Sequence, residues 1–278
     1  MAAPMKSARE TCSGCCGLAA NELKAGCDGR VIIPELSIQV PDGKVSVIIG
    51  GNGCGKSTLL KSLARLMRPI GGQVLVDGRA IHELPTKKLA QRLGLLPQSP
   101  LVPEGVRVAD LVARGRFPYQ PFLGGMSDAD LAAVAEAMQM MGVDGLADRC
   151  VDELSGGQRQ RVWIAMALAQ QTGILLLDEP TTYLDIAYQI EILDLVSELN
   201  RRRSTTVVMV LHDINLSSRY ADHMFALRKG ELHLEGTPGE VVTAQTMRDV
   251  FDLECEIITD PVSGSPFVIP KGKCRAGE

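Results

Sequence analysis

A glycine-rich turn that ends in lysine and serine carries the strongest chemical pattern in this sequence. Gly50, Gly55, Lys56 and Ser57 have the spacing G-x-x-x-x-G-K-S, after a β-branched run and before an amphipathic one. Glycines allow the backbone to turn so that its N–H groups converge on phosphate oxygens. The lysine can reach the β- and γ-phosphates of a nucleoside triphosphate, and the serine hydroxyl can bind Mg²⁺. The predicted nucleotide-binding residues here are Gly50, Asn52, Gly53, Cys54, Gly55, Lys56, Ser57 and Thr58.

Two adjacent carboxylates follow an apolar run later in the chain. Residues 174–177 have the continuous apolar character of a strand buried on both faces, and Asp178 and Glu179 come directly after them. A carboxylate beside the glycine turn can hold Mg²⁺, directly or through water, and Asp178 is the predicted ligand. A second carboxylate one residue later can take a proton from an attacking water, which makes Glu179 the predicted general base. The pair is a weak signal alone and a strong one beside the glycine turn.

A second glycine motif lies at residues 154–161, which read LSGGQRQR. Ser155, Gly156 and Gly157 stand at the start of a predicted helix, and a helix start is a second place where an anion can bind. One nucleotide does not need two such cradles from one chain. Two chains arranged head to tail would use both, because each chain would contribute its serine loop to the nucleotide of the other.

These motifs, in this order, resemble the ABC (ATP-binding cassette) transporter ATPase family, whose most specific signature is LSGGQ. The resemblance covers about residues 21 to 270 and implies ATP as substrate, Mg²⁺ as cofactor and a head-to-tail dimer. Gln98 resembles the glutamine that senses Mg²⁺ and the transmembrane subunit, Asp185 the loop that communicates between monomers, and His212 the histidine that contacts the γ-phosphate. The predicted catalytic residues are Glu179, His212 and Gln98, the predicted metal ligands are Ser57, Gln98 and Asp178, and the further nucleotide contacts are Ser155, Gly156, Gly157, Gln158 and Asp185.

The sequence departs from the family pattern at Cys27 and Gly51. Cys27 aligns with the position where the family has an aromatic residue stacked on adenine, and a thiol offers no such face. Base–aromatic stacking contributes roughly 1–3 kcal/mol in other nucleotide complexes, so we expect weaker ATP binding or weaker base selectivity. A different alignment register in this stretch is the competing interpretation. At Gly51 the family has proline, and glycine can adopt the same turn.

Further segments are similar to the importer subgroup for iron(III)–siderophore complexes. They are residues 103–106 (PEGV), 115–119 (GRFPY), 181–185 (TTYLD) and 260–266 (DPVSGSP). The resemblance implies an ATPase subunit that works with transmembrane permease subunits and, indirectly, with an extracytoplasmic substrate-binding protein. Haem and vitamin B12 importer ATPases remain alternatives, and so does a soluble ABC-type ATPase for iron–sulfur assembly. Cargo is chosen by other subunits, so this assignment is by analogy.

Strands and helices that alternate along the chain predict an α/β fold with a mostly parallel sheet. The strands are expected at residues 45–49, 174–177 and 205–211, and a helical subdomain is expected as an insertion at about 97–155. Within it, Ser127 and Asp130 have the spacing of a capping box, and Leu131, Val134, Met138 and Met141 are predicted to share a buried face. The predicted organisation is a mobile leader at 1–20, an ATPase domain at 21–270 and a tail at 271–278.

Composition bounds the remaining possibilities. The chain has 278 residues, is 45% hydrophobic and has a formal net charge of −4, which argues weakly against nucleic acid as a partner. It lacks a signal pattern and an apolar run of about 18 residues, so we expect the chain to remain in the cytoplasm. The resemblance to ABC transporter ATPases implies that it is a peripheral protein at the cytoplasmic face of the membrane. Cys12, Cys15 and Cys16 could bind Zn²⁺ or an iron–sulfur centre, but no second cysteine pair has the matching spacing. Reduced thiols in a mobile leader are the favoured interpretation.

Overall fold

A six-stranded sheet forms the centre of the computed structural model, which describes residues 17–27, 29–98, 104–121, 124–182 and 184–273. Its strand order is β10-β9-β3-β8-β7-β6, and every neighbouring pair is parallel except β9 and β10. The α/β prediction with a mostly parallel sheet is therefore confirmed. The strands are β3 (Val45–Gly50), β6 (Leu93–Leu96), β7 (Ile174–Asp178), β8 (Thr206–Val210), β9 (His223–Arg228) and β10 (Glu231–Gly236).

The three central strands have no exposed face. Every residue of β3, β7 and β8 is buried, as the uninterrupted apolar runs predict for strands covered on both sides. Because the three strands are parallel neighbours, their carboxyl ends lie side by side at one edge of the sheet. That edge is where ligands bind in open α/β sheets, and here it receives the glycine turn, the carboxylate pair and His212.

A second, antiparallel sheet was not part of the prediction. Its order is β2-β1-β4-β5, and it packs on α1 (Lys56–Leu63). Its first strand begins at Leu18 and buries Leu18 and Ala20 completely, so the folded part starts before the predicted boundary at residue 21. The cysteines at 12, 15 and 16 lie outside the described residues. The strands are β1 (Leu18–Cys27), β2 (Arg30–Val40), β4 (Gly71–Val76) and β5 (Arg79–Ala80).

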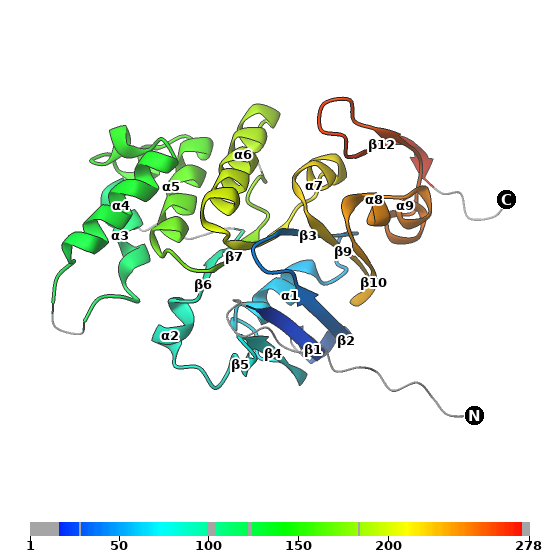
Figure 1. The fold of residues 1–278 in the computed structure, drawn as a ribbon, viewed down its shortest axis with the longest axis horizontal. Coiled ribbons are helices and arrows are strands. Elements are labelled where there is room, and N and C mark those ends of the chain that lie inside the picture. The colour runs from blue at the N-terminus through cyan, green and yellow to red at the C-terminus, as the bar shows by residue number, and fades with distance from the viewer. Residues whose placement is uncertain (1–16, 28, 99–103, 122–123, 183, 274–278) are drawn as a thin grey trace.

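Helices α3, α4 and α5 gather at one end of the molecule (Figure 1). The capping box at Ser127 is present, because Ser127 Oγ accepts from the Asp130 N–H and Asp130 Oδ2 accepts from the Ser127 N–H. The predicted buried face of α4 is wrong at Leu131, which is 55% exposed, while Ala133 and Ala137 of the same helix are buried. The helices of this part are α3 (Val108–Ala113), η1 (Arg114–Arg116), α4 (Asp128–Met140), η2 (Asp144–Leu146), η3 (Val151–Glu153) and α5 (Gly156–Ala169).

The C-terminal part forms a hairpin at the opposite end of the molecule (Figure 1). β11 (Leu253–Thr259) pairs with β12 (Pro266–Lys273), and the Asn215 side chain of α7 bonds to both backbone groups of Val268. The remaining helices are α2 (Thr86–Ala90), α6 (Ile186–Arg203), α7 (Ile214–Tyr220), α8 (Pro238–Val241) and α9 (Ala244–Phe251). Within the described ranges, no helix is both long and apolar enough to cross a membrane.

Candidate functional site

The glycine turn joins β3 to α1 and is shaped by close approaches that only glycine allows. Gly50 has φ +153°, and a Cβ there would lie 2.5 Å from the Leu227 carbonyl oxygen and 2.6 Å from Cys54 Sγ. Lys56 is almost fully buried, and its Nζ donates to the carbonyl oxygens of Gly50 at 2.8 Å and Gly51 at 3.0 Å. The turn is thus folded around the ammonium group, which places a positive charge where phosphate oxygens are predicted to bind.

Asp178 lies at the carboxyl end of β7 and faces the first turn of α1. Ser57 Oγ donates to Asp178 Oδ1 at 3.2 Å, so two of the three predicted Mg²⁺ ligands are adjacent. Burial raises the pKa of the Asp178 carboxyl, and the charge of Glu179 raises it further, while the bond from Ser57 opposes both effects. A buried carboxylate with this bias gains from a cation beside it. The oxygen pair therefore fits a hard divalent ion such as Mg²⁺.

Glu179 is held by three side chains from separate segments. His212 Nε2 lies 2.6 Å from Glu179 Oε1, while Glu179 Oε2 accepts hydrogen bonds from Gln98 Nε2 and, at 3.1 Å, from Thr182 Oγ1. The Glu179 side chain is 9% exposed and that of His212 is 49% exposed, so the histidine lies on the open side of the carboxylate. The predicted catalytic residues Glu179, Gln98 and His212 are therefore brought together, and Thr182 is a contact that no sequence pattern indicated.

A cavity of about 600 Å³ joins these groups. The predicted residues on its walls are Asn52, Gly53, Gly55, Lys56, Ser57, Thr58, Glu179 and His212. Sequence analysis missed four further wall residues, namely Arg30, Val31, Ile32 and Lys229. Arg30 and Lys229 add positive charge to a site predicted to hold a polyanion. They have no motif of their own, because tertiary structure alone brings β2 and the β9–β10 turn to the glycine turn.

The β9–β10 turn contacts the glycine turn directly. The Gly230 N–H donates to the Cys54 carbonyl oxygen at 2.9 Å. Gly230 has φ +85°, and a Cβ there would lie 1.9 Å from the Ile32 carbonyl oxygen, so any other residue would separate the turn from β2. Lys229 gains its position on the cavity wall from this contact.

The serine–glycine helix start lies elsewhere in the chain. Ser155 and Gly156 are exposed and do not line the cavity. Ser155 caps α5, its Oγ accepting from the Gln158 N–H at 3.3 Å, while Gln158 Oε1 accepts from the Ser155 N–H at 3.2 Å. Asp185 is also exposed and caps α6, where it accepts from the Tyr188 N–H. One chain therefore does not bring Ser155, Gly156, Gly157, Gln158 or Asp185 to the walls of its own phosphate cavity.

Cys27 is exposed at the end of β1 and pairs in register with Arg30 of β2. Arg30 lines the cavity, whereas Cys27 does not contribute to its walls. The predicted base-binding role of the Cys27 position stays a prediction.

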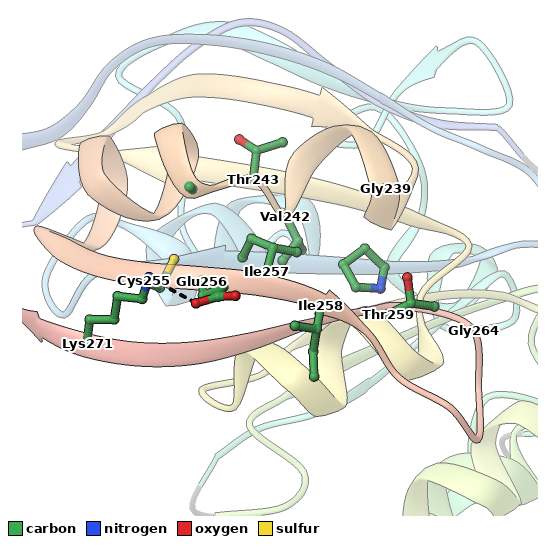
Figure 2. Close-up of a pocket in the computed structure, with 12 residues that line it drawn as sticks. Gly239, Val242, Thr243, Cys255, Glu256, Ile257, Ile258, Thr259, Gly264 and Lys271 are labelled. Carbon is green, nitrogen blue, oxygen red and sulfur yellow. Dashed lines mark ion pairs between the residues drawn. The ribbon is translucent and has the colours of Figure 1, made fainter.

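A second hollow, of about 690 Å³, lies between β11 and the α8–α9 connection. Figure 2 shows Val242 and Thr243 on one side of it and the side chains of β11 on the other, with Lys271 and Glu256 forming an ion pair. It contains none of the predicted site residues. Size alone therefore does not identify the functional cavity.

Comparison with known proteins finds the same organisation elsewhere. A family model described as ABC transporter matches residues 33–182. The achromobactin transport ATP-binding protein CbrD of Dickeya dadantii is 52% identical, covering 94% of this chain and 97% of that protein. The ferric enterobactin transport ATP-binding protein FepC of Escherichia coli is 50% identical, covering 92% and 94%. A dimeric structure of the bacterial ABC transporter cassette MJ0796, bound to ADP and Pi, has a TM-score of 0.69 at 28% identity and covers 79% of this chain and 98% of that one.

Proposed function

This chain belongs to the ABC transporter family, and from that membership and the site geometry we propose that it hydrolyses ATP to power an importer. The observation that carries the proposal is the Glu179 carboxylate, held by Gln98 and His212 at the wall of the cavity that Lys56 and the glycine turn also form. The triphosphate binds at that turn, with its charge compensated by the Lys56 ammonium and by the backbone N–H groups at the start of α1.

Hydrolysis requires a base near the attacking water. Glu179 is fixed in orientation by its three hydrogen-bonding neighbours and borders the cavity, so it can accept the proton as water attacks the γ-phosphorus. His212 is the more exposed partner, and it can leave Glu179 to contact a γ-phosphate oxygen as charge builds up there. The bonds from Gln98 and His212 hold the carboxylate in place before nucleotide arrives.

Mg²⁺ is the cofactor that the donor set fits. Ser57, Asp178 and Gln98 offer a hydroxyl, a carboxylate and an amide oxygen, which are hard ligands suited to this ion. When bound, Mg²⁺ would offset charge on the triphosphate. Gln98 connects this ligand set to Glu179 through its amide nitrogen.

A complete site requires a second copy of the chain. The α5 start is capped and does not line the phosphate cavity of its own chain; Ser155 and Gly156 are exposed, and Gly157 is buried beside them. This supports a head-to-tail dimer in which Ser155 and Gly157 close over the ATP of the partner. Closure would add donors and exclude water, and this couples hydrolysis to assembly. The MJ0796 cassette has a dimeric structure with bound ADP and Pi, which supports the same arrangement here.

The cargo proposed is an iron(III)–siderophore complex. Two relatives that match almost the whole chain are named for the transport of achromobactin and ferric enterobactin. The chain would work at the cytoplasmic face of the membrane, bound to transmembrane permease subunits that receive cargo from an extracytoplasmic substrate-binding protein. An uptake assay with radioactive iron tests the cargo: cells that carry Lys56→Ala should lose siderophore-dependent iron uptake, and loss of only haem or vitamin B12 uptake would contradict it.

The Glu179→Gln variant tests the catalytic proposal. A loss of general-base catalysis lowers turnover by about 10²–10⁴-fold, while ATP binding remains because the glycine turn is unchanged. Turnover is measured by phosphate release and ATP binding by calorimetry. Glu198→Gln is the matched control, because Glu198 lies on the exposed surface of α6 and pairs with Arg202. Near-normal hydrolysis by Glu179→Gln would refute the role given to Glu179.

A further inference from the structure

Two helix starts that serve different parts of the proposed mechanism are in direct contact. Gly157 lies in the first turn of α5, and Tyr188 lies in the first turn of α6, three residues after the cap Asp185. A Cβ placed on Gly157 would meet Tyr188 Cδ1 at 3.4 Å, so the ring packs against the serine–glycine start of α5, residues 155–158, which we call the signature turn. The ring is 41% exposed, so it is not a core residue that the fold needs for burial.

Neighbouring contacts hold the ring and the two helices together. The Arg161 guanidinium lies 5.5 Å from the centre of the Tyr188 ring, and Arg161 Nη2 pairs with Glu191 Oε2 of α6 at 2.5 Å. The amide of Gln160 donates to the Pro180 carbonyl oxygen at 2.9 Å, directly after Glu179. Successive residues of α5 are therefore tied to the segment that carries the general base and Asp185.

We propose that Tyr188 is a positioning residue that sets the orientation of the signature turn for the ATP of the partner subunit. The inference rests on the head-to-tail dimer proposed above. Within one chain, the ring packs against the buried Gly157 and leaves Ser155 exposed, so Ser155 is free to meet a second chain. The same ring belongs to the helix capped by Asp185, so contacts within one chain join the start of α5 to the loop predicted to communicate between monomers.

Removal of the ring has a selective consequence. Without it, the first turn of α5 loses the surface against which Gly157 rests, and Arg161 loses its stacking partner. A misplacement of about 1 Å in a positioning element can cost on the order of 10²-fold in rate. ATP binding by the single chain should not change, because Tyr188 does not line the phosphate cavity.

The experiment compares Tyr188→Ala with Tyr188→Phe, each in a Glu179→Gln background, in which blocked hydrolysis is expected to let the closed dimer persist. Phenylalanine is the matched control because it keeps the ring, and within the described part of the chain the Tyr188 hydroxyl has no hydrogen-bond partner. Sedimentation velocity with ATP and Mg²⁺ gives the dimerisation constant, calorimetry gives ATP affinity, and thermal unfolding reports on folding. For Tyr188→Ala we expect at least about tenfold weaker dimerisation, unchanged ATP affinity and only a small fall in melting temperature. For Tyr188→Phe we expect parental dimerisation.

The outcomes separate this inference from the proposed function. A parent that dimerises together with a Tyr188→Ala variant that dimerises equally well would overturn the positioning role and leave the two-chain site standing. A Tyr188→Phe variant as defective as Tyr188→Ala would also overturn it, since the ring would then not be the element that matters. A Glu179→Gln parent that remains monomeric with ATP would refute the dimer and the inference with it.

Discussion

The starts of α1 and α5 are both built from glycines, yet they are in different states. No side chain among the described residues caps α1, and its N–H groups border the cavity beside the buried Lys56. At α5, the Ser155 hydroxyl and the Gln158 amide satisfy each other's N–H groups at the surface. A helix start leaves several N–H groups without a partner, so each of these two must find one.

The two helix starts therefore differ in whether they can bind a ligand within a single chain. α1 offers its N–H groups and a lysine to a ligand within one chain, whereas α5 has reciprocal bonds that satisfy it until a second chain approaches. The α4 start is a third case. It has the same capping box as α5, but Asp130 also pairs with the buried Arg116 at 2.8 Å, which makes it a structural feature. The predictions below test this distinction.

Lys56→Ala should have the largest effect on the α1 start, where it should lower ATP affinity. Hydrogen bonds to charged groups contribute about 1.5–3 kcal/mol, so ATP affinity should fall about tenfold to a hundredfold. Calorimetry on the monomeric protein measures it. Lys61→Ala is the matched control, because Lys61 lies on the exposed face of the same helix. Equal ATP affinities for the two variants would remove Lys56 from the site.

Ser155→Asp should prevent the α5 start from meeting the partner's ATP, without unfolding the helix. Aspartate is as good a helix cap as serine and suits the helix dipole, so stability should be retained. Its charge would repel the triphosphate of the partner, and ATP-driven dimerisation and turnover should fall at least about tenfold. Ser155→Asn, which caps without charge, is the control. Reduced ATP binding by the Ser155→Asp monomer would contradict the separation of the two helix starts.

Cys27→Tyr should tighten ATP binding at the α1 start, because the tyrosine ring adds a surface on which the base can stack. Stacking of about 1 kcal/mol corresponds to about fivefold tighter ATP binding, with little effect on binding of inorganic triphosphate. Competition with a fluorescent nucleotide measures both. No gain for ATP would favour a different register for the base-binding strand.

Asp130→Asn should have the smallest effect on ATP binding, because its effect is confined to the stability of the fold. Hydrogen bonds from Ser127 and Arg116 lower the pKa of Asp130 from its ordinary 3.8 to about 2. A lowered pKa stabilises the folded state above the ordinary value, and the contribution is lost as pH falls through that of the folded state. The difference in unfolding free energy between parent and variant should therefore be present at pH 5 and shrink between about pH 4 and pH 2. Urea unfolding across this range measures it, and a difference independent of pH would contradict the assignment.

The features of this protein that could be predicted from the sequence are those formed by residues close together in the chain. The uninterrupted apolar runs predict β3, β7 and β8, because strands buried on both faces have no polar alternation. The capping boxes and the glycine turn are also local, since their bonds join residues three to six positions apart. The prediction failed at Leu131, where helical spacing cannot say which side of a helix meets its neighbours.

The residues that lie far apart in the sequence but line the same phosphate cavity are known from the tertiary structure alone. Arg30 and Lys229 reach the phosphate cavity through strand pairing and the Gly230 contact, and neither has a local pattern. The contact of Tyr188 with Gly157 is similar, because it depends on how α5 and α6 lie side by side. A motif can be predicted from the sequence when its residues are close together in the chain. A long-range contact cannot, because only the folded chain brings its partners together.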